Sequence, residues 1–546
     1  MKTRRIAVVA GVLCLCSMAA FASASTSGSA EEVTPNETLI QRLMKPMTSV
    51  TDGTVTVEGK PIHYEAVAGT LVIHGAGTKE TIPQAAMSYV AYFKQGADPS
   101  RRPITFLYNG GPGSSSVWLL MGSFGPKRVV TNDHTHTPAA PYEMVNNQYS
   151  LLDVSDLVFI DMPGTGFGRL LPQGKTAAER ASDHKKLAKE LWGVDGDAQA
   201  FARFITQFLT RYDRWNSPKY LYGESYGTTR SAVLANILEE QVGIDLNGVI
   251  MQSQLLDYCD SIDGPRGNPG IIEPYVLGLP TYAATAWYHR QLPKYDNGKL
   301  WPLLKQVIHF ARTTYASALL AGSTLSPQRE REVAEQLHEF AGLPTAYWIR
   351  ANLRVSGGMF EHELLNATDT TTGRLDTRFS GPSMDPTGEM SEYDPQGAAI
   401  GSAYLSEFNE YVRKDLKFGK DMSYWPDAEA SDFNWKLAHQ AIGLTQANDG
   451  SCVLNVMPDL AAAMIYNPRL KVMLNDGFYD LSTPFYTAIY DLQHLQIPRA
   501  LDKNISYAFY PSGHMIYVHV PSLRLLHDNV ARFIEASDGE NAGNDR

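Results

Sequence analysis

The sequence feature that most constrains the fold is a serine flanked by glycines, Gly223-Glu-Ser-Tyr-Gly227. It follows a strand-like run at 219–222, and residues 228–240 after it carry an apolar stripe of helical period. In a strand, turn and helix of this kind the serine lies on a strained turn with its hydroxyl clear of the sheet edge, and side chains in place of the glycines would collide with the turn. A chain with 44 glycines can match the pattern by chance, so the prediction depends on the flanking strand and helix.

The composition is that of a large folded protein. With 546 residues, of which 44% are hydrophobic and 19% charged, the chain can bury a large core and hold two or three domains. Its formal net charge of −11 argues against a nucleic-acid partner, which would require a basic face. The sequence contains no H-E-x-x-H motif, no Cys/His cluster and no G-x-G-x-x-G after a strand, so we expect neither a metal nor a cofactor.

The N-terminus has the pattern of a secretory signal peptide. Lys2, Arg4 and Arg5 precede an apolar stretch over 6–21 and a small-x-small cleavage site at 22–24. An apolar stretch of about sixteen residues is short for a membrane span. We therefore expect a signal peptide over 1–24, no stable membrane insertion after its cleavage, and a secreted or periplasmic protein.

Two cysteines lie beyond the predicted cleavage site, Cys259 and Cys452. An export compartment permits a disulfide between them, which would join the middle of the chain to its C-terminal part. The alternative is two buried thiols, and the sequence does not decide between the two states.

Strands alternate with helices along most of the chain, which predicts a mostly parallel sheet with both faces covered. A long middle region interrupts the alternation, as an inserted, largely helical cap domain would. The expected organisation is a loose segment over 25–49, a first part of the core over 50–254, the cap over 255–443, a second part of the core over 444–535, and a disordered tail over 536–546.

A hydrolytic serine needs a base, an orienting acid and an oxyanion hole. His514 is the favoured base, because it follows the strand 506–510 at the sheet edge where open α/β sheets place their sites. The strand 471–474 is followed by Asp476 and Asp480, and the residue pattern alone does not choose between these two acids. The order Ser, Asp, His is that of the α/β-hydrolase fold, which is the fold class we predict.

The candidate for the oxyanion hole is the loop Asn109-Gly-Gly-Pro-Gly113, which follows the strand 104–109 upstream of the serine. Adjacent glycines let backbone N–H groups approach a developing oxyanion. The alternative is a plain Gly/Pro turn.

Taken together, five motifs resemble the serine carboxypeptidase family in order and spacing, over about residues 50–535. They are Asn109–Ser116, Phe159–Phe167, Gly223–Gly227, Gly477–Asp480 and Gly513–His514. The resemblance implies a secreted, bacterial-type α/β-hydrolase that releases residues from peptide C-termini through an acyl-enzyme, best at acidic pH. Its substrates would be peptides with a free C-terminus. The resemblance does not decide whether the protein forms a homodimer.

The resemblance also implies a role for each candidate residue of the triad. Ser225 corresponds to the nucleophile, His514 to the general base and then acid, and Asp480 to the residue that orients the histidine. Asp480 is favoured over Asp476 because the family's aspartate lies three residues after the glycine that is Gly477 here.

Two further sets of groups follow from the resemblance. The oxyanion hole would be formed by the N–H groups of Gly111 and Tyr226. Asn109, Gly110 and Glu224 would hold the α-carboxylate of the substrate. A protonated glutamate can donate to a carboxylate, whereas an ionised one would repel it.

The sequence departs from the family at three positions. Ser114 replaces a cysteine that forms a disulfide with the cap in many relatives, and Leu107 replaces a tryptophan. Ser123 stands where the family has a second glutamate, which would share a proton with Glu224. The last change bears on strict exopeptidase behaviour and leaves an esterase or acyltransferase on the same triad as the alternative. A non-catalytic scaffold is the remote alternative, which the intact triad disfavours.

Overall fold

The computed structural model describes residues 37–266, 269–296, 298–428, 433–439, 441 and 454–542. The predicted signal peptide over 1–24 and Cys452 lie outside the described residues. Cys259 lies in the 3₁₀ turn η5 (Tyr258–Asp260), and the structure does not decide between a disulfide with Cys452 and two thiols. In the described part of the chain, no helix is both long and apolar enough to cross a membrane.

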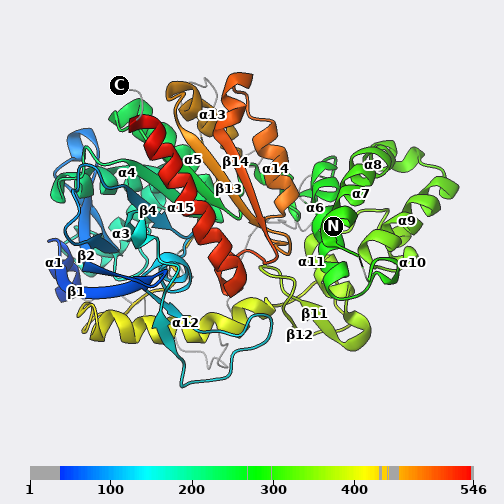
Figure 1. The fold of residues 1–546 in the computed structure, drawn as a ribbon, viewed down its shortest axis with the longest axis horizontal. Helices are drawn as coiled ribbons and strands as arrows, with labels where there is room; N and C mark the ends of the chain where they lie inside the picture. Colours follow the sequence, from blue (N-terminus) through cyan, green and yellow to red (C-terminus); the bar gives the residue numbers. More distant parts are fainter. Residues whose placement is uncertain are drawn as a thin grey trace, which may run out of the picture.

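The centre of the fold is a ten-stranded sheet in which β1, β2, β3, β7, β4, β9, β10, β13 and β14 lie side by side and β8 pairs with β3 (Figure 1). The strands are β1 (Thr48–Val57), β2 (Lys60–His74), β3 (Pro83–Lys94), β4 (Ile104–Tyr108), β7 (Asp156–Ile160), β8 (Arg169–Leu170), β9 (Lys219–Glu224), β10 (Gly248–Gln252), β13 (Lys471–Gly477) and β14 (Ile505–Tyr510). The pairs from β7 through β14 are parallel, while β1, β2 and β3 form an antiparallel arm. The predicted α/β-hydrolase sheet is confirmed.

Helices cover both faces of the sheet, because its central strands are apolar on both sides and must be buried on both. One hydrophobic core lies under α4 (Val194–Arg211), α5 (Tyr226–Asn236), α13 (Met457–Tyr466) and α14 (Phe485–Gln493). The other lies under α2 (Val117–Leu119) and α15 (Val520–Ala542), and Figure 1 shows α15 crossing the sheet beside β13 and β14.

The chain between β10 and β13 forms a helical body with a hydrophobic core of its own, seen beside the sheet in Figure 1. Its helices are α6 (Glu273–Tyr288), α7 (Leu300–Phe310), α8 (Ala316–Ala321), α9 (Pro327–Ala341), α10 (Thr345–Arg350) and α11 (Gly357–Glu363). Two small sheets lie outside the main sheet, β5 (Lys127–Val129) with β6 (Met144–Asn146), and β11 (Thr370–Thr372) with β12 (Ser380–Pro382). The inserted body is largely helical, as the sequence predicts.

The structure differs from the expected organisation in three segments. Helix α12 (Pro395–Lys414), expected in the cap, packs its apolar face on the sheet core. The segment 25–49, expected to be loose, contains α1 (Glu37–Leu43) and the start of β1, because Leu43 is buried in the same core. The expected tail 536–546 begins inside α15, where the Tyr220 hydroxyl lies 2.8 Å from Ser537 Oγ.

Candidate active site

Ser225 lies on the sharp turn between β9 and α5 that its flanking residues predict. Its backbone has φ 62° and ψ −130°, a conformation that costs free energy for a residue with a side chain and is frequent at functional sites. A Cβ at Gly223 would meet the carbonyl oxygen of Gly227, and one at Gly227 would lie 2.9 Å from the carbonyl oxygen of Tyr108. Both glycines are therefore required by the close approach of the turn to its neighbours.

His514 and Asp480 are hydrogen bonded, with 2.7 Å between His514 Nδ1 and Asp480 Oδ2. Both side chains are buried. Asp480 also accepts bonds from the backbone N–H groups of Ser482 and Thr483 and from the Thr483 hydroxyl, at 2.7–2.9 Å. Burial disfavours the imidazolium, but the charge of Asp480 and its hydrogen bond outweigh burial and raise the pKa of His514.

The geometry separates the two acids that the sequence leaves open. Asp476 lies within β13 and accepts a bond of 3.2 Å from the backbone N–H of Gln254, while Asp480 lies beyond the strand and contacts His514. Burial, followed by the nearby charge of Asp480, raises the pKa of Asp476 well above its ordinary value.

The end of β10 joins the serine turn to the histidine loop. The Ser225 N–H donates to the carbonyl oxygen of Gln252 at 3.0 Å. The Gln252 amide and the Ser253 hydroxyl both donate to the carbonyl oxygen of His514, at 3.0 and 2.7 Å. The parallel order of β9, β10, β13 and β14 therefore brings Ser225, Asp480 and His514 to one edge of the sheet.

The glycine loop after β4 packs directly on the start of α5. A Cβ at Gly110 would collide with the backbone nitrogen of Tyr226 and lie 2.8 Å from that of Gly227. Tyr226 is the first residue of α5, where N–H groups have no acceptor within the helix. Within the described residues no backbone or side-chain group accepts a bond from the Gly111 N–H. Two backbone donors are thus available beside Ser225.

A buried ion pair that the residue pattern does not predict supports this loop. Arg230 on α5 pairs with Asp197 on α4 at 2.6 Å, and neither side chain is exposed. The guanidinium also donates to the carbonyl oxygen of Asn109 at 2.8 Å and lies 4.2 Å from the ring centre of Phe201. The pair fixes the first residue of the glycine loop against the serine helix.

Glu224 is 3% exposed and lies among hydrogen-bond donors. Its Oε1 accepts a bond of 2.7 Å from the Asn109 amide, and its Oε2 accepts one of 2.9 Å from the Gln252 amide. Burial raises the pKa of Glu224 from 4.5 to about 7, although the charge of His514 and the hydrogen-bonding groups of Tyr517 and Asn109 act in the opposite direction. This carboxyl is therefore protonated through the acidic range.

The three positions that depart from the family have other partners here. The Ser114 hydroxyl accepts a bond of 3.0 Å from the indole of Trp118. Leu107 is buried in the sheet core. Ser123 lies in the π-helical turn η2 (Leu120–Phe124), and its hydroxyl donates to the carbonyl oxygen of Leu119 at 2.6 Å.

Two segments from beyond β10 reach the site. The His514 N–H donates to the carbonyl oxygen of Leu375 at 2.7 Å, and the Gly513 N–H donates to Asp376 at 3.1 Å. The ring of Trp435 lies edge-on to Tyr226, with 5.0 Å between the ring centres. The inserted region therefore contributes directly to the surroundings of the histidine and of the serine helix.

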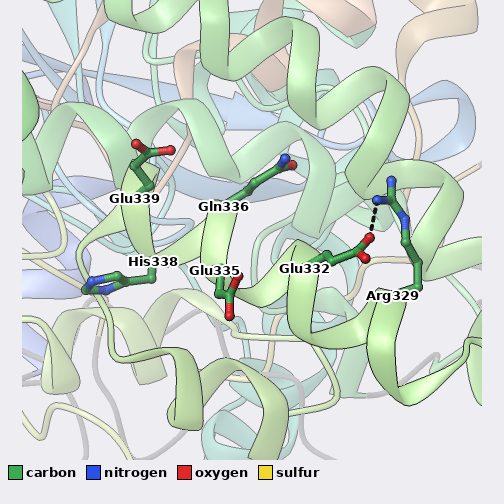
Figure 2. Close-up of a pocket in the computed structure, with 6 residues that line it drawn as sticks. All are labelled: Arg329, Glu332, Glu335, Gln336, His338 and Glu339. Atoms are coloured by element: carbon green, nitrogen blue, oxygen red, sulfur yellow. Dashed lines mark hydrogen bonds and ion pairs between the residues drawn. The ribbon is translucent and has the colours of Figure 1, made fainter.

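A separate hollow lies on the cap, along α9, and contains none of the candidate residues. Figure 2 shows its lining side chains projecting in different directions from the helix. Arg329 and Glu332 form an ion pair of 2.9 Å. Among the described residues, no three His, Cys, Asp or Glu side chains are grouped as metal ligands would be.

The fold is that of the α/β-hydrolases, and the candidate site at this edge of the sheet is centred on a serine. The family model described as "Serine carboxypeptidase" matches residues 78–264. Serine carboxypeptidase-like 2 of Arabidopsis thaliana is 26% identical over 209 residues, which are 36% of this chain and 42% of the relative. Serine carboxypeptidase-like 33 of the same plant is 29% identical over 185 residues, which are 32% and 33% of the two chains.

Among solved structures, Kex1(delta)p, a prohormone-processing carboxypeptidase from Saccharomyces cerevisiae, matches with a TM-score of 0.50 and 15% identity. The match covers 86% of this chain and 91% of that one and bears on the fold. The chain spans less than half of the length of the curated relatives it matches. The resemblance to serine carboxypeptidases is confirmed. The family model reaches Ser225 and the glycine loop, while Asp480 and His514 lie beyond it.

The raised pKa of Glu224 predicts a pH-dependent contribution to stability. In the unfolded chain this carboxyl ionises near its ordinary pKa of 4.5, and in the folded chain near 7. Its contribution is therefore fully present below pH 4.5 and is lost as the pH rises through 7, by about 3 kcal/mol in all. Comparing thermal unfolding with that of Glu224→Gln between pH 4 and 8 should show the wild type losing stability relative to the variant. A difference that does not change with pH would contradict the prediction.

Proposed function

We propose that this protein is a secreted serine-type carboxypeptidase that releases C-terminal residues from peptides. The observation that carries the proposal is the position of Glu224. It is a buried carboxyl with a pKa near 7, bonded to the glycine-loop residue Asn109 and adjacent in sequence to Ser225. An esterase has no need for such a group, whereas an enzyme that binds a substrate carboxylate needs a neutral donor there.

The proposed reaction proceeds through an acyl-enzyme. Ser225 Oγ attacks the last peptide carbonyl carbon while His514 accepts the hydroxyl proton at Nε2, since Nδ1 is bonded to Asp480. The oxyanion is stabilised by the N–H groups of Gly111 and Tyr226, each contributing about 3 kcal/mol. His514 then protonates the leaving amino group, and water attacks the acyl-enzyme by the same route.

The proposed carboxylate site consists of Asn109, Gly110 and Glu224. With Glu224 protonated, the site offers donors and carries no negative charge of its own. Ionisation would place a carboxylate beside the substrate's carboxylate, and binding would weaken. The proposed preference for acidic pH follows from this single group.

An esterase or acyltransferase on the same triad is the second candidate, and the observation that favours it is Ser123. The hydroxyl of Ser123 is bonded within its own turn, so this position offers no carboxyl to pair with Glu224.

The proposals of secretion and of a signal peptide rest on the sequence pattern at residues 1–24.

The first test is release of the C-terminal amino acid from an N-blocked dipeptide at pH 5, with the C-terminally amidated dipeptide as the matched substrate. We expect release from the free acid to be at least about tenfold faster, because only this substrate carries the carboxylate that the proposed site binds. A tenfold difference corresponds to about 1.4 kcal/mol. Ser225→Ala should show no release. Equal cleavage of both substrates, or cleavage of esters alone, would reject the carboxypeptidase in favour of the second candidate.

The choice between the two aspartates gives a second test. Asp480→Asn should lower kcat by about 10⁴, because the histidine loses the group that fixes its tautomer and stabilises its positive charge. Asp476→Asn is the matched control, and its kcat should stay within about tenfold of the wild type because Asp476 makes no bond to His514. The reverse ranking in steady-state kinetics would reassign the orienting acid.

The pH profile tests Glu224 itself. As the pH rises through about 7 this carboxyl ionises, so kcat/KM for the free-acid dipeptide should fall over that range. Glu224→Gln cannot ionise, and its profile should be flat there at a lower overall rate. An alkaline limb that is the same in the variant and the wild type would show that another group is responsible.

A further inference from the structure

The hydroxyl of Tyr517 is a buried polar group that the proposed reaction does not use. Tyr517 lies in the 3₁₀ turn η12 (Ile516–Val518), three residues after His514, and is 2% exposed. Its hydroxyl oxygen is shielded from solvent and makes no well-formed hydrogen bond among the described residues, although the side chains of Glu224 and Asn109 lie within reach of it. Leaving such a group unpaired costs about 1–3 kcal/mol, so its presence calls for a physical reason.

Tyr517 lies against the same groups that form the proposed carboxylate site. Glu224 and Asn109 are both close enough to Tyr517 to influence the ionisation of its hydroxyl. Burial, followed by the proximity of Glu224, raises the pKa of Tyr517 well above its ordinary value, so the hydroxyl keeps its proton.

Tyr517 also fills the space beside the turn that carries Ser123. A Cβ at Gly122 would collide with the ring of Tyr517 and would meet the hydroxyl of Tyr404. The Ser123 hydroxyl is already bonded to its own turn. At the place where the resemblance expects a second glutamate, the structure therefore offers tyrosine hydroxyls.

Of the two tyrosines, Tyr517 is the better donor candidate. The side chains of Glu224 and Asn109 both act on the hydroxyl of Tyr517, whereas the charge of Glu224 and that of Arg128 are the ones that act on Tyr404. Tyr517 also follows His514 in the same loop, so its position is tied to that of the proposed base.

We propose that Tyr517 is a specificity-determining residue whose hydroxyl donates a hydrogen bond to the C-terminal carboxylate of the substrate. This assignment rests on the proposed function and names one further residue of its carboxylate site. A phenol is a neutral donor that needs no shared proton, in contrast to a second carboxyl. In this chain one carboxyl, Glu224, and one hydroxyl, Tyr517, would together do what two carboxyls do in the family that the chain resembles.

The experiment measures binding rather than turnover. In the Ser225→Ala background, calorimetry would give Kd for an N-blocked dipeptide with a free C-terminus and for the same dipeptide as an amide. Adding Tyr517→Phe should raise Kd for the free acid about tenfold or more, since a hydrogen bond to a charged group contributes about 1.5–3 kcal/mol. Kd for the amide should stay within about twofold.

Two matched variants serve as controls. Tyr411→Phe removes another buried hydroxyl, which is bonded to Tyr92 at 3.0 Å, and should lower the Tm while leaving the ratio of the two Kd values unchanged. The hydroxyl of Tyr517 makes no well-formed hydrogen bond in the described structure, so Tyr517→Phe should lower the Tm less than Tyr411→Phe does. Tyr404→Phe should leave the Kd ratio within about threefold.

Four results would overturn the assignment. They are an unchanged Kd ratio in Tyr517→Phe, an equal loss for acid and amide, a loss of the ratio in Tyr404→Phe instead, and a Ser225→Ala parent that does not prefer the free acid. Failure of the proposed function is a separate result. In that case the enzyme with Ser225 intact releases no amino acid, while the Ser225→Ala protein still binds the free acid through Tyr517.

Discussion

The strained turn at Ser225 is the constraint on which the rest of the site depends. A serine with φ 62° between a strand and a helix persists only where its surroundings hold it, and here they do so from several sides. The bare backbone of Gly223 and Gly227 allows the close approach, the end of β10 accepts the Ser225 N–H, and the Arg230–Asp197 pair fixes the glycine loop against the helix. Removing one partner of a buried ion pair leaves an uncompensated charge, so the two residues must be retained together.

The sheet turns this local arrangement into a site. Parallel strands end at one edge, so residues that follow β9, β13 and β14 lie at the same edge of the sheet although they are far apart in the sequence. Gln252 at the end of β10 takes part in three of the resulting contacts. Its carbonyl holds the serine turn, and its side-chain amide donates to Glu224 and to the carbonyl oxygen of His514. One residue of a central strand thereby sets the relative positions of the proposed nucleophile, base and carboxylate site.

Much of this could be predicted from the sequence because it depends on local patterns. The glycine-flanked serine, the strand before it and the helix after it are contiguous in the chain, and short apolar strands alternate with helices through most of the core. The choice between Asp476 and Asp480 depends on how the turn after β13 folds, which periodicity does not describe. The helical periodicity of α12 identifies an apolar face, but it does not predict whether that face packs on the cap or on the sheet. Arg230 and Tyr517 lie within apolar segments and become informative only when their buried partners are known.

Burial connects stability, binding and pH dependence in this site. Glu224 is inside the protein because the glycine loop and the serine helix close over it, and that closure raises its pKa to about 7. The same desolvation that makes its ionisation costly to the fold keeps it protonated, and so able to donate, in acid. Adding a second carboxyl next to it would require a shared proton and would couple the two ionisations. Tyrosine hydroxyls at that place avoid the second charge, so the proposed carboxylate site retains a single group that titrates near neutral pH.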